Sequence, residues 1–183
     1  MSAITRSWLS FAAFGAGIIH LALVISSPLA IGIPLAVVGL AELVWGVLIL
    51  IKNRLVLPRL AQAGAITPLL LWSLLTVTAT LLASPGITTS LRFIPMGIAG
   101  LFELFVAAVL SVIARRQSDT DQPLRPSPPT GAIRYLSSVI LAGILVGALT
   151  TPALAATQAG SVALEHGGTM SGMMTMNVPG LNH

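Results

Sequence analysis

Long apolar runs separated by short polar joints dominate the pattern of hydrophobic and polar positions along this chain. Five of them have about the 20 residues that an α-helix needs to cross the hydrocarbon core of a bilayer. They cover residues 8–26, 30–51, 64–83, 93–114 and 135–153. The pattern predicts an all-α fold, namely a polytopic helical membrane protein with five transmembrane helices.

A short pattern within these runs occurs twice. Residues 33–43 and 94–104 both fit I-P-x4-G-L-x-E-L, and the two copies are 61 residues apart. The duplication predicts two homologous hairpins, residues 8–51 and 64–114, within a four-helix membrane core of residues 1–116. Residues 132–153 then form an appended fifth helix.

Two polar segments flank this fifth helix. Residues 117–131 are rich in proline and polar side chains, which predicts an extended cytoplasmic linker that buries little apolar surface. Residues 154–183 are rich in Gly, Ala, Thr and Met. We expect them to form a short, flexible tail.

The basic residues predict the orientation, because Lys and Arg collect on the cytoplasmic side of transmembrane helices. With the N-terminus inside, eight of the nine basic residues lie in the cytoplasm and only Arg92 lies outside. The eight are Arg6, Lys52, Arg54, Arg59, Arg115, Arg116, Arg125 and Arg134. The sequence thus favours a multi-pass protein of the plasma membrane with a cytoplasmic N-terminus and an extracytoplasmic tail.

Composition narrows the function classes. The 183 residues are 55% hydrophobic and 8% charged, whereas soluble domains carry about 25% charged residues. The basic residues lie at the ends of apolar runs, so the partner they indicate is the lipid bilayer and not a nucleic acid. The chain has no cysteine and none of the common hydrolase, P-loop, metalloprotease or dinucleotide-binding motifs, which argues against an enzyme.

One histidine and two glutamates fall inside the predicted membrane helices: His20, Glu42 and Glu103. An intramembrane ionisable residue is a functional-site hypothesis by default, because a charge in hydrocarbon is costly. Both glutamates lie eight residues after the proline of the repeated pattern, about 12 Å along the helix at 1.5 Å per residue. His20 and Glu42 can pair across the first hairpin, whereas the expected partners of Glu103 are Thr76, Thr78 and Thr80.

Small residues lie one turn to either side of each glutamate. Gly39 and Gly46 flank Glu42, and Gly100 and Ala107 flank Glu103. Because small residues mark helix–helix contacts in bilayers, we expect both carboxyl groups to face the bundle. Two interpretations stay open. In the functional one, these residues form a relay for protons or cations, or a site for a quinone-like head group. In the structural one, the glutamates are neutral carboxylic acids that hydrogen-bond to a neighbouring helix.

The C-terminal tail carries the most specific ligand chemistry. Four of the six methionines and two of the three histidines lie within residues 166–183. Thioethers prefer Cu(I), and imidazole suits copper generally. We therefore expect a copper site formed by His166, Met170, Met173, Met174 and Met176. The alternatives are an adaptable apolar strip that docks on a partner protein and an inert tail.

The fifth helix suggests partners of another kind. Gly143 and Gly147 form a G-x-x-x-G motif that lets another helix approach closely, within this chain or in a second protein. This motif favours an accessory subunit of a larger membrane complex, for example a respiratory one. Arg134, the apolar run to Leu149 and residues 152–156 together also resemble a signal peptide, and cleavage after Ala155 would release the segment that carries Met and His.

The first hairpin resembles one group of known sequences. Residues 17–22 (GIIHLA) followed by Gly39-Leu-Ala-Glu42 resemble small uncharacterised bacterial membrane proteins in which a first-span histidine precedes a second-span G-x-x-[EQ]. The resemblance covers about a third of the chain and implies no particular activity. The leading hypothesis is a non-enzymatic membrane protein that binds or delivers copper. The alternatives are the accessory subunit and a proton or cation transporter or channel.

Overall fold

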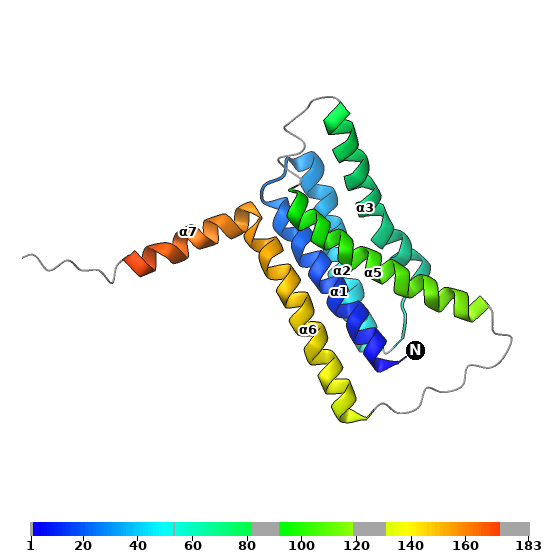
Figure 1. Ribbon diagram of the computed structural model, residues 1–183. Coiled ribbons are helices and arrows are strands. Elements are labelled where there is room, and N and C mark those ends of the chain that lie inside the picture. The colour runs from blue at the N-terminus through cyan, green and yellow to red at the C-terminus, as the bar shows by residue number, and fades with distance from the viewer. Residues whose placement is uncertain (1, 53, 82–91, 119–130, 173–183) are drawn as a thin grey trace, which may run out of the picture.

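The computed structural model describes residues 2–52, 54–81, 92–118 and 131–172, with side chains up to Glu165. Within these ranges all regular structure is helical (Figure 1). The helices are α1 (Ala3–Val24), α2 (Leu29–Lys52), α3 (Pro58–Leu81), α5 (Phe93–Ser118), α6 (Ala132–Ala155) and α7 (Gln158–Gly172).

Five of these helices, all except α7, are long and apolar enough to cross a membrane. They run 22 to 26 residues, or about 33–39 Å at 1.5 Å per residue, against a hydrocarbon core of about 30 Å. The prediction of an all-α fold with five such helices is therefore confirmed for the described residues.

Two of the helices begin earlier than the apolar pattern predicts. Helix α1 begins at Ala3, because the Ser2 side chain accepts a hydrogen bond from the backbone N–H of Thr5 and caps the first turn. Helix α3 begins at Pro58, a residue favoured at the first position of a helix. Apolar periodicity does not detect such polar first turns.

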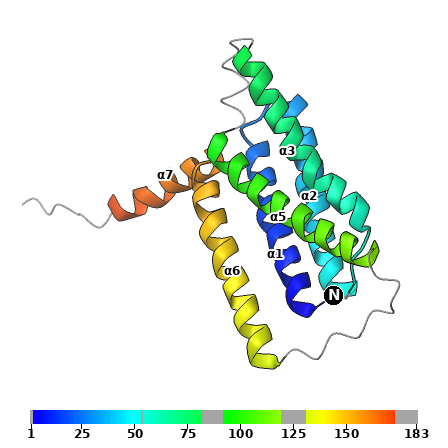
Figure 2. The ribbon, with the colours of Figure 1, turned by 45° about the vertical axis from the view of Figure 1, so that its right-hand side comes forward.

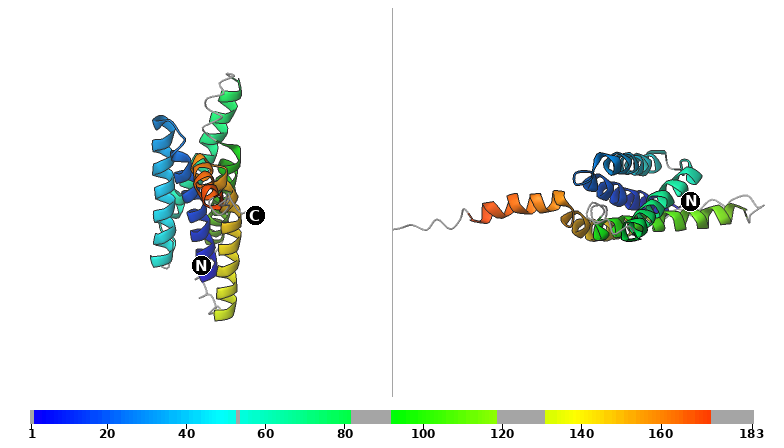
Figure 3. Two further views of the ribbon diagram at one scale, coloured as in Figure 1. Left: turned by 90° about the vertical axis from the view of Figure 1, so that its left-hand side faces the viewer. Right: turned by 90° about the horizontal axis from the view of Figure 1, so that it is seen from above.

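Helix α1 is the centre of the bundle. It packs against α2 on one side and against α5 and α6 on the other, and Figure 3 shows it between them. It is also the most buried of the five long helices. Small residues on several of its faces, such as Ala12, Ala13 and Ala16, let the neighbouring helices approach.

Helices α1 and α2 approach so closely that their backbones touch. A Cβ atom on Gly17 would lie 2.8 Å from the carbonyl oxygen of Gly39, and a Cβ atom on Gly39 would lie 2.8 Å from that of Gly17. Two turns further along α2, the Ser10 hydroxyl donates a 2.8 Å hydrogen bond to the carbonyl oxygen of Gly46. Glycine at these positions sets the spacing of the first hairpin.

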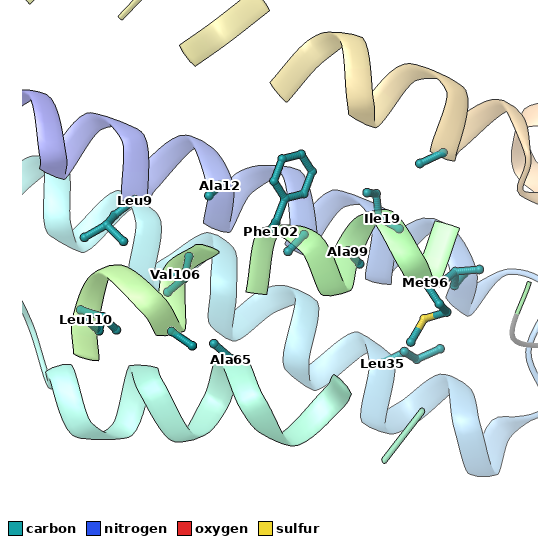
Figure 4. Close-up of a cluster of buried hydrophobic side chains, with 14 of the residues drawn as sticks. Leu9, Ala12, Ile19, Leu35, Ala65, Met96, Ala99, Phe102, Val106 and Leu110 are labelled. Atoms are coloured by element: carbon teal, nitrogen blue, oxygen red, sulfur yellow. The ribbon is translucent and has the colours of Figure 1, made fainter. Parts of the chain in front are cut away.

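The apolar core joins α5 to this hairpin. Its buried side chains include Ile19 from α1, Leu35 from α2, and Met96 and Phe102 from α5 (Figure 4). The Phe102 ring lies over Gly15 of α1, where a Cβ atom would come within 2.6 Å of it. Helix α5 is thereby held against α1, on the face that carries His20.

The remaining long helices attach through fewer contacts. Helix α3 packs on α5, where the Gln62 amide donates a hydrogen bond to the Ser111 hydroxyl, and it barely touches α2. Helix α6 packs on α1, where the Trp8 indole donates a hydrogen bond to Ser138. The two hairpins therefore differ in packing, although the repeated pattern predicts homologous ones.

Part of the expected flexible tail is helical, which the sequence pattern does not predict. Residues Gln158–Gly172 form helix α7, which turns sharply away from the end of α6 (Figure 2). The turn is stabilised by Thr157, whose hydroxyl donates to the carbonyl oxygen of Leu154 and accepts from the N–H of Gly160. Arg92 also donates a 2.6 Å hydrogen bond to the carbonyl oxygen of Ala156. These bonds satisfy polar groups at the junction of the two helices.

Candidate functional site

The three intramembrane polar residues come together from three different helices: His20 from α1, Glu42 from α2 and Glu103 from α5. The His20 side chain is fully buried, and the side chains of Glu42 and Glu103 are 15% and 2% exposed. We call these three residues the triad. Such burial of three ionisable groups needs a specific explanation.

The imidazole of His20 lies between the two carboxyl groups. Its Nδ1 atom is 2.8 Å from Oε2 of Glu42, which is a hydrogen bond. Its Nε2 atom is 3.6 Å from Oε1 of Glu103, which is longer than a hydrogen bond. Both Nε2 and Oε1 are buried without a hydrogen-bond partner. In native proteins such unpaired groups are rare, and they often mark a functional site.

The close approach of α1 and α2 positions the first pair. Gly17 and Gly39, whose backbones touch, each precede a triad residue by three positions, which places the contact next to His20 and Glu42. Side chains lean toward the N-terminus of their own helix, so in this antiparallel hairpin His20 and Glu42 lean toward each other. A Cβ atom on Gly39 would also lie 3.2 Å from Cβ of His20.

The position of Glu103 differs from the sequence-based expectation. Threonines of α3 were its expected partners, but the hydroxyls of Thr76 and Thr80 bond to carbonyl oxygens of their own helix. The carboxyl group of Glu103 instead faces His20. A clue exists in the sequence, because the repeated pattern puts Glu103 at the same position as Glu42, whose partner is also His20.

A cleft adjoins the triad. It has a volume of about 590 Å³ and is lined mainly by α2, α3 and the loop between them, with Ala13 and Ala16 of α1 and Val106 of α5. Among the described residues, Glu42 and Glu103 are its only charged lining residues. The cleft extends to Val56 and Leu57, beyond the end of α2. The two carboxyl groups therefore face a pocket that is otherwise almost entirely apolar.

The triad also offers ligand atoms for a metal ion. One nitrogen and two carboxylate oxygens lie within 4.8 Å of one another. Nδ1 of His20 bonds to Glu42, so an ion bound at Nδ1 would have to replace this hydrogen bond. Zinc sites use three or four protein ligands. The triad therefore offers the minimum number of protein ligands for such a site, as well as atoms that can bind a proton.

The small residues predicted at helix contacts have different surroundings. Gly39, Gly46 and Gly100 each lie against a neighbouring side chain or backbone, and Ala107 is part of the buried core. By contrast, a Cβ atom on Gly143 or Gly147 would meet nothing within 4 Å. The G-x-x-x-G motif of α6 therefore makes no close contact within the described part of the chain.

The predicted copper ligands have no described side chains. His166 and Met170 belong to α7, but the described side chains end at Glu165. Met173, Met174 and Met176 lie outside the described residues. The copper site therefore stays a prediction from sequence.

No protein family, curated protein sequence or solved structure matches this chain in comparisons with known proteins. The function therefore has to be argued from the triad, the cleft and the distribution of charge.

Proposed function

We propose that this chain is a multi-pass protein of the plasma membrane that transfers protons through Glu42, His20 and Glu103, as a proton-coupled transporter or channel and not as an enzyme. One observation carries the proposal: a single buried imidazole faces two carboxyl groups with its two different nitrogen atoms. Imidazole can accept a proton at one nitrogen and release another from the second, which makes histidine a proton shuttle.

The transfer is a sequence of two proton movements. A protonated Glu103 gives its proton to Nε2 of His20, and the resulting imidazolium gives the proton on Nδ1 to Glu42. One proton has then moved from Glu103 to Glu42, and the ring must recover its first tautomer before the next transfer. The gap of 3.6 Å between Nε2 and Oε1 must close to a hydrogen-bond length of about 2.7–3.0 Å for the first step.

The energetics of burial explain why the triad holds protons. With a neutral imidazole and two ionised carboxylates, the three groups carry a net charge of −2, which is very costly away from water. Two added protons make the triad neutral, and the loss of one leaves a charge of −1. The charge of the triad thus changes by one with each proton taken up or released.

We infer that the cleft gives the triad access to the cytoplasmic side. In the proposed positive-inside orientation, the end of the cleft at Val56 and Leu57 would lie on that side. Toward the other side, Leu23, Leu35 and Met96 are buried in the core. We propose that this arrangement is an inward-open state, in which the triad exchanges protons with the cytoplasmic side.

The test is proton flux into liposomes that contain the full-length, N-terminally tagged protein and an internal pH-sensitive dye, driven by a potassium diffusion potential. Because the relay needs both carboxyl groups, Glu42→Gln combined with Glu103→Gln should lower the flux at least 10-fold. His20→Gln should have the same effect, because an amide cannot take a proton at neutral pH.

The matched control is Glu165→Gln, an exposed acid on α7, which should leave the flux unchanged. Monodisperse elution and an unchanged helical circular dichroism spectrum would show that the variants are folded. Equal flux in the wild type and the double variant would disprove the relay.

Copper handling by the tail is a second and independent proposal. It rests on the sequence, where His166 and four methionines are concentrated in a segment without cysteine. The accessory-subunit proposal likewise rests on Gly143 and Gly147, which face no close neighbour in the described chain. Neither proposal depends on the triad.

A further inference from the structure

The cleft beside the triad has the size and opening of a ligand site. Its volume of about 590 Å³ lies within the range of about 300–1,000 Å³ that small-molecule sites occupy. Helices α2 and α3, which form its walls, barely contact each other. Lining residues such as Val44, Leu60 and Gly64 are exposed, so the cleft is open along one side.

The charge of the cleft selects a cation. Its charged lining residues are both acidic, and no Lys or Arg lines it in the described part of the chain. The Glu103 side chain is only 2% exposed, and its Oε1 atom has no hydrogen-bond partner. A ligand with one positive charge can replace one proton of the triad without changing the total charge.

The apolar lining of the cleft favours a cation that carries a large apolar group. Val38, Leu48 and Leu60 are typical of the lining, so a hydrated inorganic ion would have to shed water against hydrocarbon. Trp45 also lines the cleft, and its indole N–H donates a 2.8 Å hydrogen bond to the carbonyl oxygen of Val56, which holds the ring in place. An aromatic face can attract an organic cation directly.

We infer that the cleft between α2 and α3 binds a lipophilic organic cation with a single positive charge, whose charged group lies at Glu42 and Glu103 and whose apolar body lies along α2 and α3. This inference rests on the proposed function, because it names the substrate class of a proton-coupled transporter. The ligand binds as a proton leaves the triad, and a returning proton displaces it.

The test measures equilibrium binding of radiolabelled tetraphenylphosphonium to the full-length protein in nanodiscs of neutral lipid, with empty nanodiscs as the background. We expect saturable binding that Glu103→Gln weakens at least 10-fold. Triphenylphosphine oxide, which is neutral and similar in shape, should not displace the cation at equal concentration.

Two matched glycine variants locate the site. Gly64 lines the cleft and Gly147 lies on α6, and a Cβ atom on either would meet nothing within 4 Å. Gly64→Trp should fill the cleft and weaken binding at least 10-fold, whereas Gly147→Trp should leave the affinity unchanged. Because both positions have open space, both variants should fold.

Each contrary result overturns the inference. Absence of saturable binding would indicate that a lipid or a second copy of the chain covers the cleft. Equal binding of the neutral compound would show that the charge of the ligand plays no role. Equal loss of binding in Gly64→Trp and Gly147→Trp would show that the ligand does not bind in the cleft. If proton flux persists without cation binding, the proton-transfer proposal holds and the cation site is disproved. If cation binding persists without flux, the cleft is a binding site and the proton-transfer proposal fails.

Discussion

At the scale of single residues, the properties of the site depend on how one histidine is shared. His20 bonds to Glu42 at 2.8 Å but lies 3.6 Å from Glu103. The first contact is a complete hydrogen bond, and the second leaves two buried atoms without partners. The asymmetry distinguishes the hydrogen-bonded pair of His20 and Glu42 from Glu103, whose Oε1 atom has no hydrogen-bond partner.

The hydrogen bond between His20 and Glu42 depends on glycine at position 39, where α1 and α2 approach each other. In Gly39→Ala the new Cβ atom would lie 2.8 Å from the carbonyl oxygen of Gly17, so α1 and α2 must move apart. Overpacking of this kind costs about 1–3 kcal/mol, and we expect the free energy of unfolding to fall by that amount. Denaturation in mixed micelles, followed by circular dichroism, measures it.

Gly97→Ala on α5 is the control, because a Cβ atom there would meet nothing within 4 Å. It should leave stability unchanged or raise it slightly, since alanine favours the helix more than glycine does. A destabilisation equal to that of Gly39→Ala would show that the contact between the two backbones is unimportant.

The sequence predicts the members of the site better than their arrangement. The free-energy cost of burying a charge in the membrane is enough to single out His20, Glu42 and Glu103. The short loop between residues 26 and 30 also predicts that His20 and Glu42 lie close together. The approach of Glu103 to His20 depends on how α5 packs against α1. Membrane helices are apolar on all sides, so their pattern does not reveal which face meets which neighbour.

At the scale of elements, helix α7 includes the positions of two proposed copper ligands, His166 and Met170. Apolar periodicity gives little signal in residues 158–172, which are rich in Gly, Ala and Ser, and the sequence pattern therefore does not predict this helix. The remaining predicted ligands follow the end of this helix in sequence.

Copper content tests the tail directly. We expect near-stoichiometric copper in the N-terminally tagged protein after extraction in mild detergent, and little in a form truncated after Ala156. Replacing Met170, Met173, Met174 and Met176 by leucine should also lower the copper content, because the thioether ligands are lost. Elemental analysis per chain gives the value.

Unchanged copper retention in the four-leucine variant would exclude the methionines as ligands. Absence of copper in the wild type, together with large proteins that co-elute, would favour the accessory-subunit proposal. Migration as a lone monomer from mild native extracts would count against that proposal.

At the scale of the whole molecule, the proposed orientation decides which side the cleft faces. The chain has no cysteine, so single cysteines can be introduced without background. We expect Leu164→Cys on α7 to react with a membrane-impermeant maleimide in intact cells, and Arg54→Cys between α2 and α3 to react only after lysis. Gel shift of the tagged protein measures both reactions.

Both positions are exposed, so burial would not limit either reaction. The opposite labelling pattern would place the cleft on the extracytoplasmic side and would overturn the proposed inward-open state. It would leave the geometry of the triad itself unaffected.

The contacts of α1 with α2 have a mechanical consequence. Two contacts hold this hairpin together. One is the close approach of the backbones at Gly17 and Gly39, and the other is the hydrogen bond from the Ser10 hydroxyl to the carbonyl oxygen of Gly46. Helix α3, by contrast, packs on α5 and barely touches α2. The hairpin and α5, which the apolar core joins to it, would then act as one rigid unit, and α3 would be the helix that moves most easily against it. Such movement would change the width of the cleft and leave the distance from His20 to Glu42 constant.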